Sequence, residues 1–238
     1  MIGVFDYTVI LTYISAVSGV LGIIVSLYGS GHPYMGAFFL LVCGLCDAFD
    51  GKVARKKKNR TDFEKSFGIQ IDSLADLISF GVLPGCMGFG LLRASDKYVD
   101  LPNFHPTDSD RAVLYPVLFV VIIMIYVLAA LIRLAYFNVT EEERARSEGG
   151  VRKTYVGLPV TSSALIFPTV LLIRFITNAD FTPIYFAVMV ITAFLFVSRI
   201  RIAKAGTRGI IIMICIGVIE FGVMLYFILT RGAIPIQP

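Results

Sequence analysis

The sequence predicts an all-α polytopic membrane protein, and three observations support this fold class. Only 16% of the 238 residues are charged, whereas a soluble globular domain carries roughly 25%. Hydrophobic residues make up 57% of the chain, and its mean hydropathy is +0.81. The apolar residues also form long blocks, several of which reach the roughly 20 residues that a helix needs to cross a bilayer core. Such a chain lacks the polar side chains to cover itself in water.

Seven apolar blocks follow one another along the chain and leave no stretch for a separate soluble domain. We expect membrane-spanning helices at about 8–28, 34–54, 67–92, 113–137, 158–177, 183–199 and 209–230.

Basic residues are distributed unevenly between the two sides of these spans. Of the 21 Lys and Arg residues, fourteen follow the second, fourth and sixth spans, and only four lie on the other side. Loops rich in Lys and Arg stay in the cytoplasm, so the sequence predicts a cytoplasmic N-terminus and an external C-terminus. This bias accounts for the net charge of +4, and no nucleic-acid partner is expected.

Four aspartates interrupt the apolar blocks near the predicted cytoplasmic surface. Asp47 and Asp50 are three residues apart in the second span, and Asp72 and Asp76 are four apart in the third. On a helix, both spacings place the two side chains on one face. A short loop joins the two spans, which should therefore be antiparallel neighbours. The four carboxylates are predicted to converge on one small volume.

Four like charges in a low-dielectric site repel one another strongly unless cations neutralise them. Two divalent cations would balance the charge, and oxygen ligands favour Mg²⁺ or Mn²⁺, with Ca²⁺ as an alternative, over zinc. A pair of metal ions can stabilise the attacking and leaving oxygens of a phosphoryl displacement. A structural charge cluster and a membrane cation transporter are the alternatives at this point.

The same residues carry a resemblance to a known family. The stretch from Asp47 to Arg55 reads DAFDGKVAR, and the stretch from Gly68 to Asp76 reads GIQIDSLAD. Together they resemble the signature D-x-x-D-G-x-x-A-R … G-x-x-x-D-x-x-x-D of the CDP-alcohol phosphotransferase family, with every signature position present. The connection between the two stretches, residues 56–67, is longer than is usual in the family.

The resemblance implies a six-helix core with a two-metal site, usually in a homodimer. Residues 1–238 would then form a single transmembrane catalytic domain, with the core at about 8–199 and an additional span at about 209–230. The site would face the cytoplasm from an integral protein of the cell membrane.

The resemblance also implies roles for individual residues. Asp47, Asp50, Asp72 and Asp76 correspond to the metal-binding positions, and Asp76 also corresponds to the proposed general base. The positions bordering the CDP moiety are Gly51, Ala54, Arg55 and Gly68, with Arg55 at the diphosphate end. Thr12 lies in a stretch that resembles a T-x-x-N element, with Ser15 in place of Asn, which suggests a nucleotide contact.

A second set of motifs is similar to the phosphatidylserine synthase branch of this family. Residues 133–138 read RLAYFN and residues 157–159 read GLP, resembling R-L-A-R-F-N and G-L-P with Tyr136 in place of Arg. The resemblance implies transfer of a phosphatidyl-type group from a CDP-linked lipid to L-serine, with release of CMP. Inositol phosphate and glycerol phosphate are the alternative acceptors.

Two residues of this region are candidates for binding serine. Arg133 is expected to bind the serine carboxylate, and Asn138 is expected to hydrogen-bond the substrate. The alternative for Arg133 is a structural role, in which its side chain extends along the helix to the membrane interface.

No motif explains Glu220, which lies near the middle of the last predicted span. An ionised carboxylate at the bilayer midplane is costly. We therefore expect Glu220 to face protein, where it either hydrogen-bonds to a neighbouring helix or stays protonated, and to serve packing or dimer contact.

Overall fold

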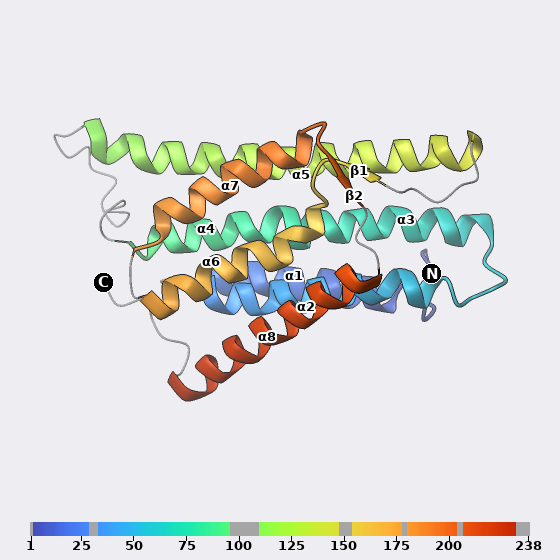
Figure 1. Ribbon diagram of the computed structural model, residues 1–238, viewed down its shortest axis with the longest axis horizontal. Helices are drawn as coiled ribbons and strands as arrows, with labels where there is room; N and C mark the ends of the chain where they lie inside the picture. Colours follow the sequence, from blue (N-terminus) through green and yellow to red (C-terminus); the bar gives the residue numbers. More distant parts are fainter. Residues whose placement is uncertain are drawn as a thin grey trace.

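The computed structural model describes residues 2–28, 33–95, 110–147, 154–177, 180–203 and 207–231, and helices dominate it (Figure 1). The helices are α1 (Ile10–Leu27), α2 (Pro33–Ala54), α3 (Asp62–Asp76), α4 (Leu83–Arg93), α5 (Asp110–Ser147), α6 (Ser163–Thr177), α7 (Thr182–Val197) and α8 (Thr207–Arg231). The short strands β1 (Thr154–Val156) and β2 (Arg201–Ala203) pair antiparallel, with Tyr155 opposite Ile202. The all-α class predicted from the sequence is confirmed.

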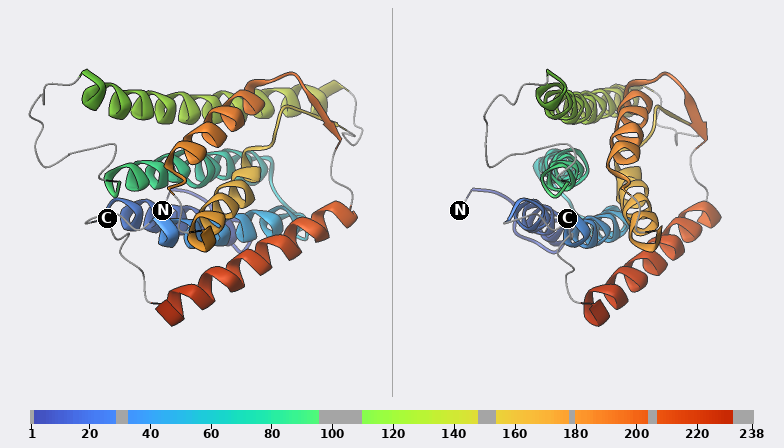
Figure 2. Two further views of the ribbon diagram at one scale, coloured as in Figure 1. Left: turned by 60° about the vertical axis from the view of Figure 1, so that its left-hand side comes forward. Right: turned by 90° about the vertical axis from the view of Figure 1, so that its left-hand side faces the viewer.

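Helices α3 and α4 form a continuous rod that lies between α5 and the α1–α2 pair (Figure 2). Viewed end-on, α5 lies above the rod, α1 and α2 lie below it, and α6 and α7 lie to one side, while α8 lies outermost and crosses obliquely against α2 and α6 (Figure 2). The α2–α3 connection, the C-terminal end of α5 and the β1–β2 pair all lie toward one end of the bundle (Figure 1). The segments that carry most of the basic residues are therefore gathered at that end.

Within the described ranges, three helices are long and apolar enough to cross a membrane, namely Ile10–Leu27, Asp62–Arg93 and Pro116–Glu143. Shorter apolar helices run over Val160–Arg174, Thr182–Val197 and Ile212–Tyr226. These helices are consistent with a polytopic membrane protein. That each of the seven predicted blocks crosses the membrane stays a prediction.

The helix ends differ from the predicted span ends because hydropathy detects apolar residues rather than helix. Helix α3 begins at Asp62, before the predicted 67, because Thr61 and Glu64 form a reciprocal capping box. Helix α5 continues past 137 to Ser147, since its polar tail is rich in helix-favouring Glu, Arg and Ala. Helix α6 begins only at Ser163.

A proline explains the irregular turn between α3 and α4. Pro84 has no N–H to donate to the carbonyl of Phe80, four residues earlier, and its ring crowds that carbonyl. The chain widens into a π-helical turn over Leu77–Val82, directly after Asp76. The buried Tyr126 hydroxyl of α5 donates to the Phe80 carbonyl oxygen at 2.7 Å. This bond joins α5 to the rod that carries Asp72 and Asp76.

Candidate metal centre and substrate site

Three of the four predicted aspartates converge in the structure. Asp47 and Asp50 project from α2 and Asp72 from α3, and each offers a carboxylate oxygen within 4.8 Å of the others. We call these three residues the acidic cluster. Asp76 lies one turn beyond Asp72, outside this group, and is buried with 9% of its surface exposed. The structure thus brings together three of the four carboxylates, and metal binding by Asp47, Asp50, Asp72 and Asp76 stays a prediction.

The acidic cluster fits a hard divalent cation. Among the residues that the structure describes, the ion pairs involve other carboxylates, so no Lys or Arg forms an ion pair with these three. Carboxylates brought together without a paired base need a cation to offset their repulsion. Oxygen donors select ions such as Mg²⁺, Mn²⁺ or Ca²⁺.

Asp50 is held in place from two directions. The hydroxyl of Thr12, buried on α1, donates to Asp50 Oδ2 at 3.3 Å, and the backbone N–H of Gly51 donates to Asp50 Oδ1. Thr12 therefore lies at the acidic cluster, next to the predicted CDP site. Its direct contact with the nucleotide stays a prediction.

Arginine side chains lie over the two predicted glycines. A Cβ atom at Gly51 would lie 3.3 Å from Arg55 Nη1, and one at Gly68 would lie 2.7 Å from Arg60 Nη2. Both glycines thus leave room for a guanidinium group beside the helix backbone. Arg60 was not predicted as a site residue from the sequence. The unusual length of the 56–67 connection, in which Arg60 lies, was the one feature that could have indicated it. Ala54 is partly exposed on the last turn of α2.

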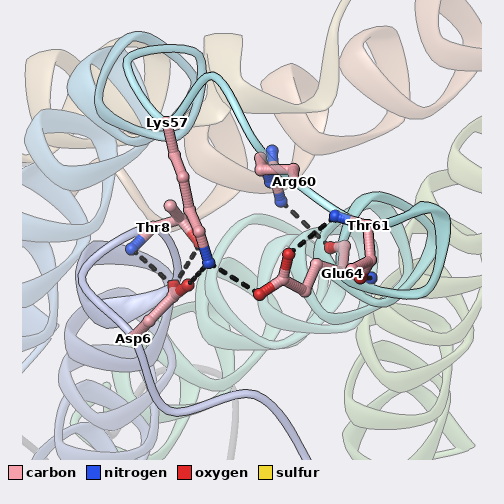
Figure 3. Close-up of polar contacts among 6 residues, drawn as sticks. All are labelled: Asp6, Thr8, Lys57, Arg60, Thr61 and Glu64. Carbon is pink, nitrogen blue, oxygen red and sulfur yellow. Dashed lines mark hydrogen bonds and ion pairs between the residues drawn. The ribbon is translucent and has the colours of Figure 1, made fainter.

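An ion-pair cluster orders this connection. Lys57 Nζ lies 2.6 Å from both Asp6 Oδ2 and Glu64 Oε1 (Figure 3). Hydrogen bonds from Lys57 and then from Thr8 lower the pKa of Asp6 from 3.8 to about 2. We call Asp6, Lys57 and Glu64 the loop clamp. It ties the connection to the N-terminal segment and to the first turn of α3, beside the predicted CDP site.

A cavity of about 570 Å³ opens beside the acidic cluster. Its polar end contains Asp47, Asp72, Lys52 and Arg55. Its other walls are mostly apolar and come from α2, α6, the turn before α6, and α8: Leu41, Gly44, Leu45, Ala48, Gly51, Thr161, Ala164, Leu165, Met213, Ile214, Gly217, Val218 and Phe221. The cavity can therefore accept a ligand with one polar and one apolar end.

Arg133 connects the two motifs of the second resemblance. Its Nε donates to the Leu158 carbonyl oxygen at 3.2 Å, and its guanidinium carbon lies 5.4 Å from the centre of the Phe137 ring. Arg133 is buried, with 6% of its surface exposed, and α5 continues well beyond it to Ser147. These contacts hold the Arg133 side chain against protein, and the choice between serine binding and a structural role stays open.

Local backbone geometry explains the Leu158 contact. Gly157 has φ +77°, and a Cβ there would lie 2.7 Å from the Phe196 carbonyl oxygen. Only glycine fits this turn, which presents the Leu158 carbonyl to α5. Asn138 contacts the helix that carries Asp72, because its Nδ2 donates at 2.8 Å to the hydroxyl of Ser73, the residue after Asp72. Serine binding by Arg133 and Asn138 stays a prediction.

Glu220 faces protein, as predicted. It is buried with 7% of its surface exposed, and its Oε1 accepts a hydrogen bond from the Thr169 hydroxyl on α6. Its other oxygen has no hydrogen-bond partner among the described residues. The contact fixes α8 against α6, and Glu220 does not belong to the acidic cluster.

Comparison with known proteins identifies the class. The profile of the CDP-alcohol phosphatidyltransferase family matches residues 7–198, and the chain belongs to this family. The resemblance seen in the two aspartate motifs is thus confirmed. Enzymes of the family use divalent metal ions, which agrees with the acidic cluster. The apolar helices and the family membership together make the chain an integral membrane protein.

Individual relatives of the chain carry more specific names. The chain is 35% identical to the CDP-diacylglycerol–serine O-phosphatidyltransferase of Saccharomyces cerevisiae over 144 residues, which are 59% of this chain and 43% of the yeast protein. It is 28% identical over 200 residues to the archaetidylserine synthase of Methanothermobacter thermautotrophicus, covering 84% of this chain and 70% of that protein. A Helicobacter pylori CDP-diacylglycerol–serine O-phosphatidyltransferase is 29% identical over 147 residues, 61% of this chain and 50% of the relative. The chain therefore spans half or less of the yeast and Helicobacter proteins.

Proposed function

We propose that this chain transfers a phosphatidyl-type group from a CDP-linked lipid to L-serine, releasing CMP and a phosphoserine-headed phospholipid. The observation that carries the proposal is the acidic cluster at the polar end of a cavity with apolar walls. A nucleotide-linked lipid needs both kinds of surface. The names of the relatives favour serine over inositol phosphate or glycerol phosphate, and favour transfer over cation transport.

Two divalent cations, Mg²⁺ or Mn²⁺ with Ca²⁺ as an alternative, would be held by Asp47, Asp50, Asp72 and Asp76. When bound, they would polarise the transferred phosphorus and stabilise the departing CMP. Thr12 and the Gly51 N–H position Asp50 for this role through their hydrogen bonds to its two oxygens.

The chain's own residues carry the proton transfer in this proposal. The serine hydroxyl oxygen forms a bond to the lipid-linked phosphorus, while the bond from that phosphorus to the CMP oxygen breaks. Asp76 accepts the hydroxyl proton, and CMP leaves with the electron pair of the broken bond. Burial of Asp76 one helical turn from Asp72 supports this role, because a buried carboxylate is shielded from bulk water.

The remaining predicted residues bind the substrates. Gly51, Ala54, Gly68 and Thr12 border the cytidine, and Arg55, which lines the cavity, pairs with the diphosphate. Arg133 and Asn138 bind the serine, and the hydrogen bond from Asn138 to Ser73, the residue after Asp72, supports this role.

We also propose that residues 1–238 act as one transmembrane catalytic domain, as a homodimer in the cell membrane. The site would face the cytoplasm, which is supported by the gathering of the basic segments at its end of the bundle (Figure 1). The mass of the purified protein in detergent, measured by size exclusion with light scattering, tests the dimer.

An acceptor screen tests the function. The purified protein is given a CDP-linked lipid, Mn²⁺ or Mg²⁺, and one of L-serine, inositol phosphate or glycerol phosphate, and CMP release is measured. We expect release with serine only. Release with a phosphorylated acceptor alone would overturn the serine assignment, and no release with any acceptor would overturn the proposed function.

A further inference from the structure

Helix α8 lies beyond the residues that match the family, yet it borders the candidate site. The family match ends at residue 198, and α8 runs over Thr207–Arg231. Met213, Ile214, Gly217, Val218 and Phe221 of α8 line the cavity whose polar end contains Asp47 and Arg55. The cavity wall formed by these five residues, which we call the α8 wall, carries no charge.

The cavity follows one stripe of α2. Leu41, Leu45, Ala48 and Lys52 line it at helical spacings of three and four residues, so they lie along one face. From Leu41 to Arg55 this face extends about 21 Å, at about 1.5 Å per residue. Its apolar part leads away from the acidic cluster toward the middle of α2. A ligand anchored at the polar end would thus extend along α2 between α6 and α8.

Two contacts hold α8 in place as a wall. The Phe221 ring stacks on the Phe38 ring of α2, with 4.8 Å between the centroids. The preceding residue, Glu220, accepts a hydrogen bond from Thr169 of α6. Held by these contacts, α8 crosses α2 obliquely (Figure 2). The volume of about 570 Å³ falls within the roughly 300–1,000 Å³ of small-molecule sites.

We infer that α8 forms one wall of a groove for a hydrocarbon chain of the CDP-linked lipid, and that it thereby selects the length and width of that chain. The inference rests on the proposed function and extends it to a segment outside the family match. A hydrocarbon chain is the expected occupant because the apolar groove is continuous with the acidic cluster, which would hold the diphosphate of the same lipid. A hydrocarbon chain is the part of such a substrate that gains from burial against apolar side chains.

Gly217 is the position at which the groove is easiest to narrow. It lines the cavity, and a Cβ there would lie 3.3 Å from Leu165 Cδ2, the flexible end of a side chain. A Cβ added at Gly217 would therefore meet this flexible side chain and no other described residue within 4 Å outside its own helix. Gly222 on the same helix is a matched control, since it is exposed and does not line the cavity, and a Cβ there would meet no described atom within 4 Å.

The test compares Gly217→Leu with Gly222→Leu on a long-chain and a short-chain CDP-lipid, with serine as acceptor. We expect Gly217→Leu to lower kcat/KM for the long-chain lipid by about tenfold. The leucine would displace roughly two methylene groups of the hydrocarbon chain from the groove, and their burial would be lost. Turnover of the short-chain lipid should stay near that of the wild type, and Gly222→Leu should change neither. Equal effects of Gly217→Leu on both lipids, or none on either, would overturn the inference.

A binding experiment on the unaltered protein keeps the inference testable if Gly217→Leu does not fold. A long-chain CDP-lipid with a photoreactive group at the chain end is bound without serine, illuminated, and mapped by mass spectrometry. We expect labelling of the α8 wall, and labelling confined to α5 or α7 would contradict it. A wild type that turns over neither lipid would instead refute the proposed function, so the two failures are distinguishable.

Discussion

At the scale of single residues, the proposed role of Asp72 in the acidic cluster can be tested against a control on the same helix. Asp72→Asn removes a charged oxygen donor from the cluster, whereas Asp62→Asn alters a carboxylate that forms an exposed pair with Lys65 on the same helix. We expect Asp72→Asn to lower transfer by about 100-fold or more, because loss of a metal ligand exceeds the roughly 10- to 100-fold effect of an outer-shell change. Asp62→Asn should retain activity.

Metal binding supplies a readout of the same change that does not depend on turnover. Mn²⁺ bound to the purified protein is counted by electron paramagnetic resonance. The Asp72→Asn protein should bind it more weakly than wild type, and EDTA should abolish both binding and transfer. Full transfer in metal-free buffer would contradict the metal centre.

Arg133 is the residue on which the serine assignment can be examined separately. Removing a charge-assisted hydrogen bond to the serine carboxylate should raise the serine KM of Arg133→Ala by about tenfold or more. The KM for the CDP-lipid should change little. A rise in both KM values, or an unchanged serine KM, would leave Arg133 with the structural role shown by its hydrogen bond to the Leu158 carbonyl.

At the scale of the elements, the loop clamp determines how the connection between α2 and α3 is held. Lys57→Met should release the connection from both carboxylates, whereas Lys58→Met alters an exposed neighbour outside the clamp. We expect amide exchange of residues 55–61, followed by mass spectrometry, to be about two- to fivefold faster in Lys57→Met only, given the modest strength of surface ion pairs.

The pH dependence of the clamp follows from Asp6. Folding lowers its pKa from 3.8 to about 2, so the contribution of the pair is complete above the unfolded pKa. It is lost as the pH falls through about 4 toward about 2. The difference in exchange between wild type and Lys57→Met should therefore be constant from about pH 5 to about pH 8. A difference that disappears within this range would contradict the Asp6–Lys57 pair.

The contact between α6 and α8 is a second feature at this scale. Glu220→Gln preserves the shape and hydrogen bonding of the side chain, so turnover should stay within about twofold of wild type. In a double-mutant cycle of Glu220→Leu with Thr169→Val, unfolding in detergent should give a coupling energy of about 0.6 kcal/mol, typical of hydrogen bonds between membrane helices. If Glu220→Gln abolished transfer in a folded protein, the packing role would be wrong.

At the scale of the whole molecule, the orientation in the membrane can be measured directly. On a background without native cysteines, Lys56→Cys lies at the α2–α3 end and the exposed Arg93→Cys at the end of α4. A membrane-impermeant maleimide should label Lys56→Cys only from the cytoplasm and Arg93→Cys only from outside, because the basic loops are expected to stay inside. The reverse pattern would refute the cytoplasmic site.

Much of this architecture could be predicted from the sequence because its determinants are local. Apolar blocks long enough to cross a bilayer predict helices, and spacings of three and four residues place Asp47 with Asp50 on one helix face. The signature between Asp47 and Asp76 lies in two short stretches close together in the sequence, which is enough to indicate the family. Hydropathy did not predict where α3 begins or where α5 ends, because the capping box at Thr61 and the polar tail before Ser147 form helix without apolar residues.

The tertiary structure alone decided which distant segments meet. The pairing of Lys57 with Asp6, the burial of Arg133 against Leu158, and the α8 wall beside the acidic cluster each join residues far apart in sequence. No local pattern encodes such contacts, because they depend on the relative positions of packed helices. The sequence by itself thus determined the helices, the family and the aspartates, whereas packing decided that an additional C-terminal helix borders the cavity beside the acidic cluster.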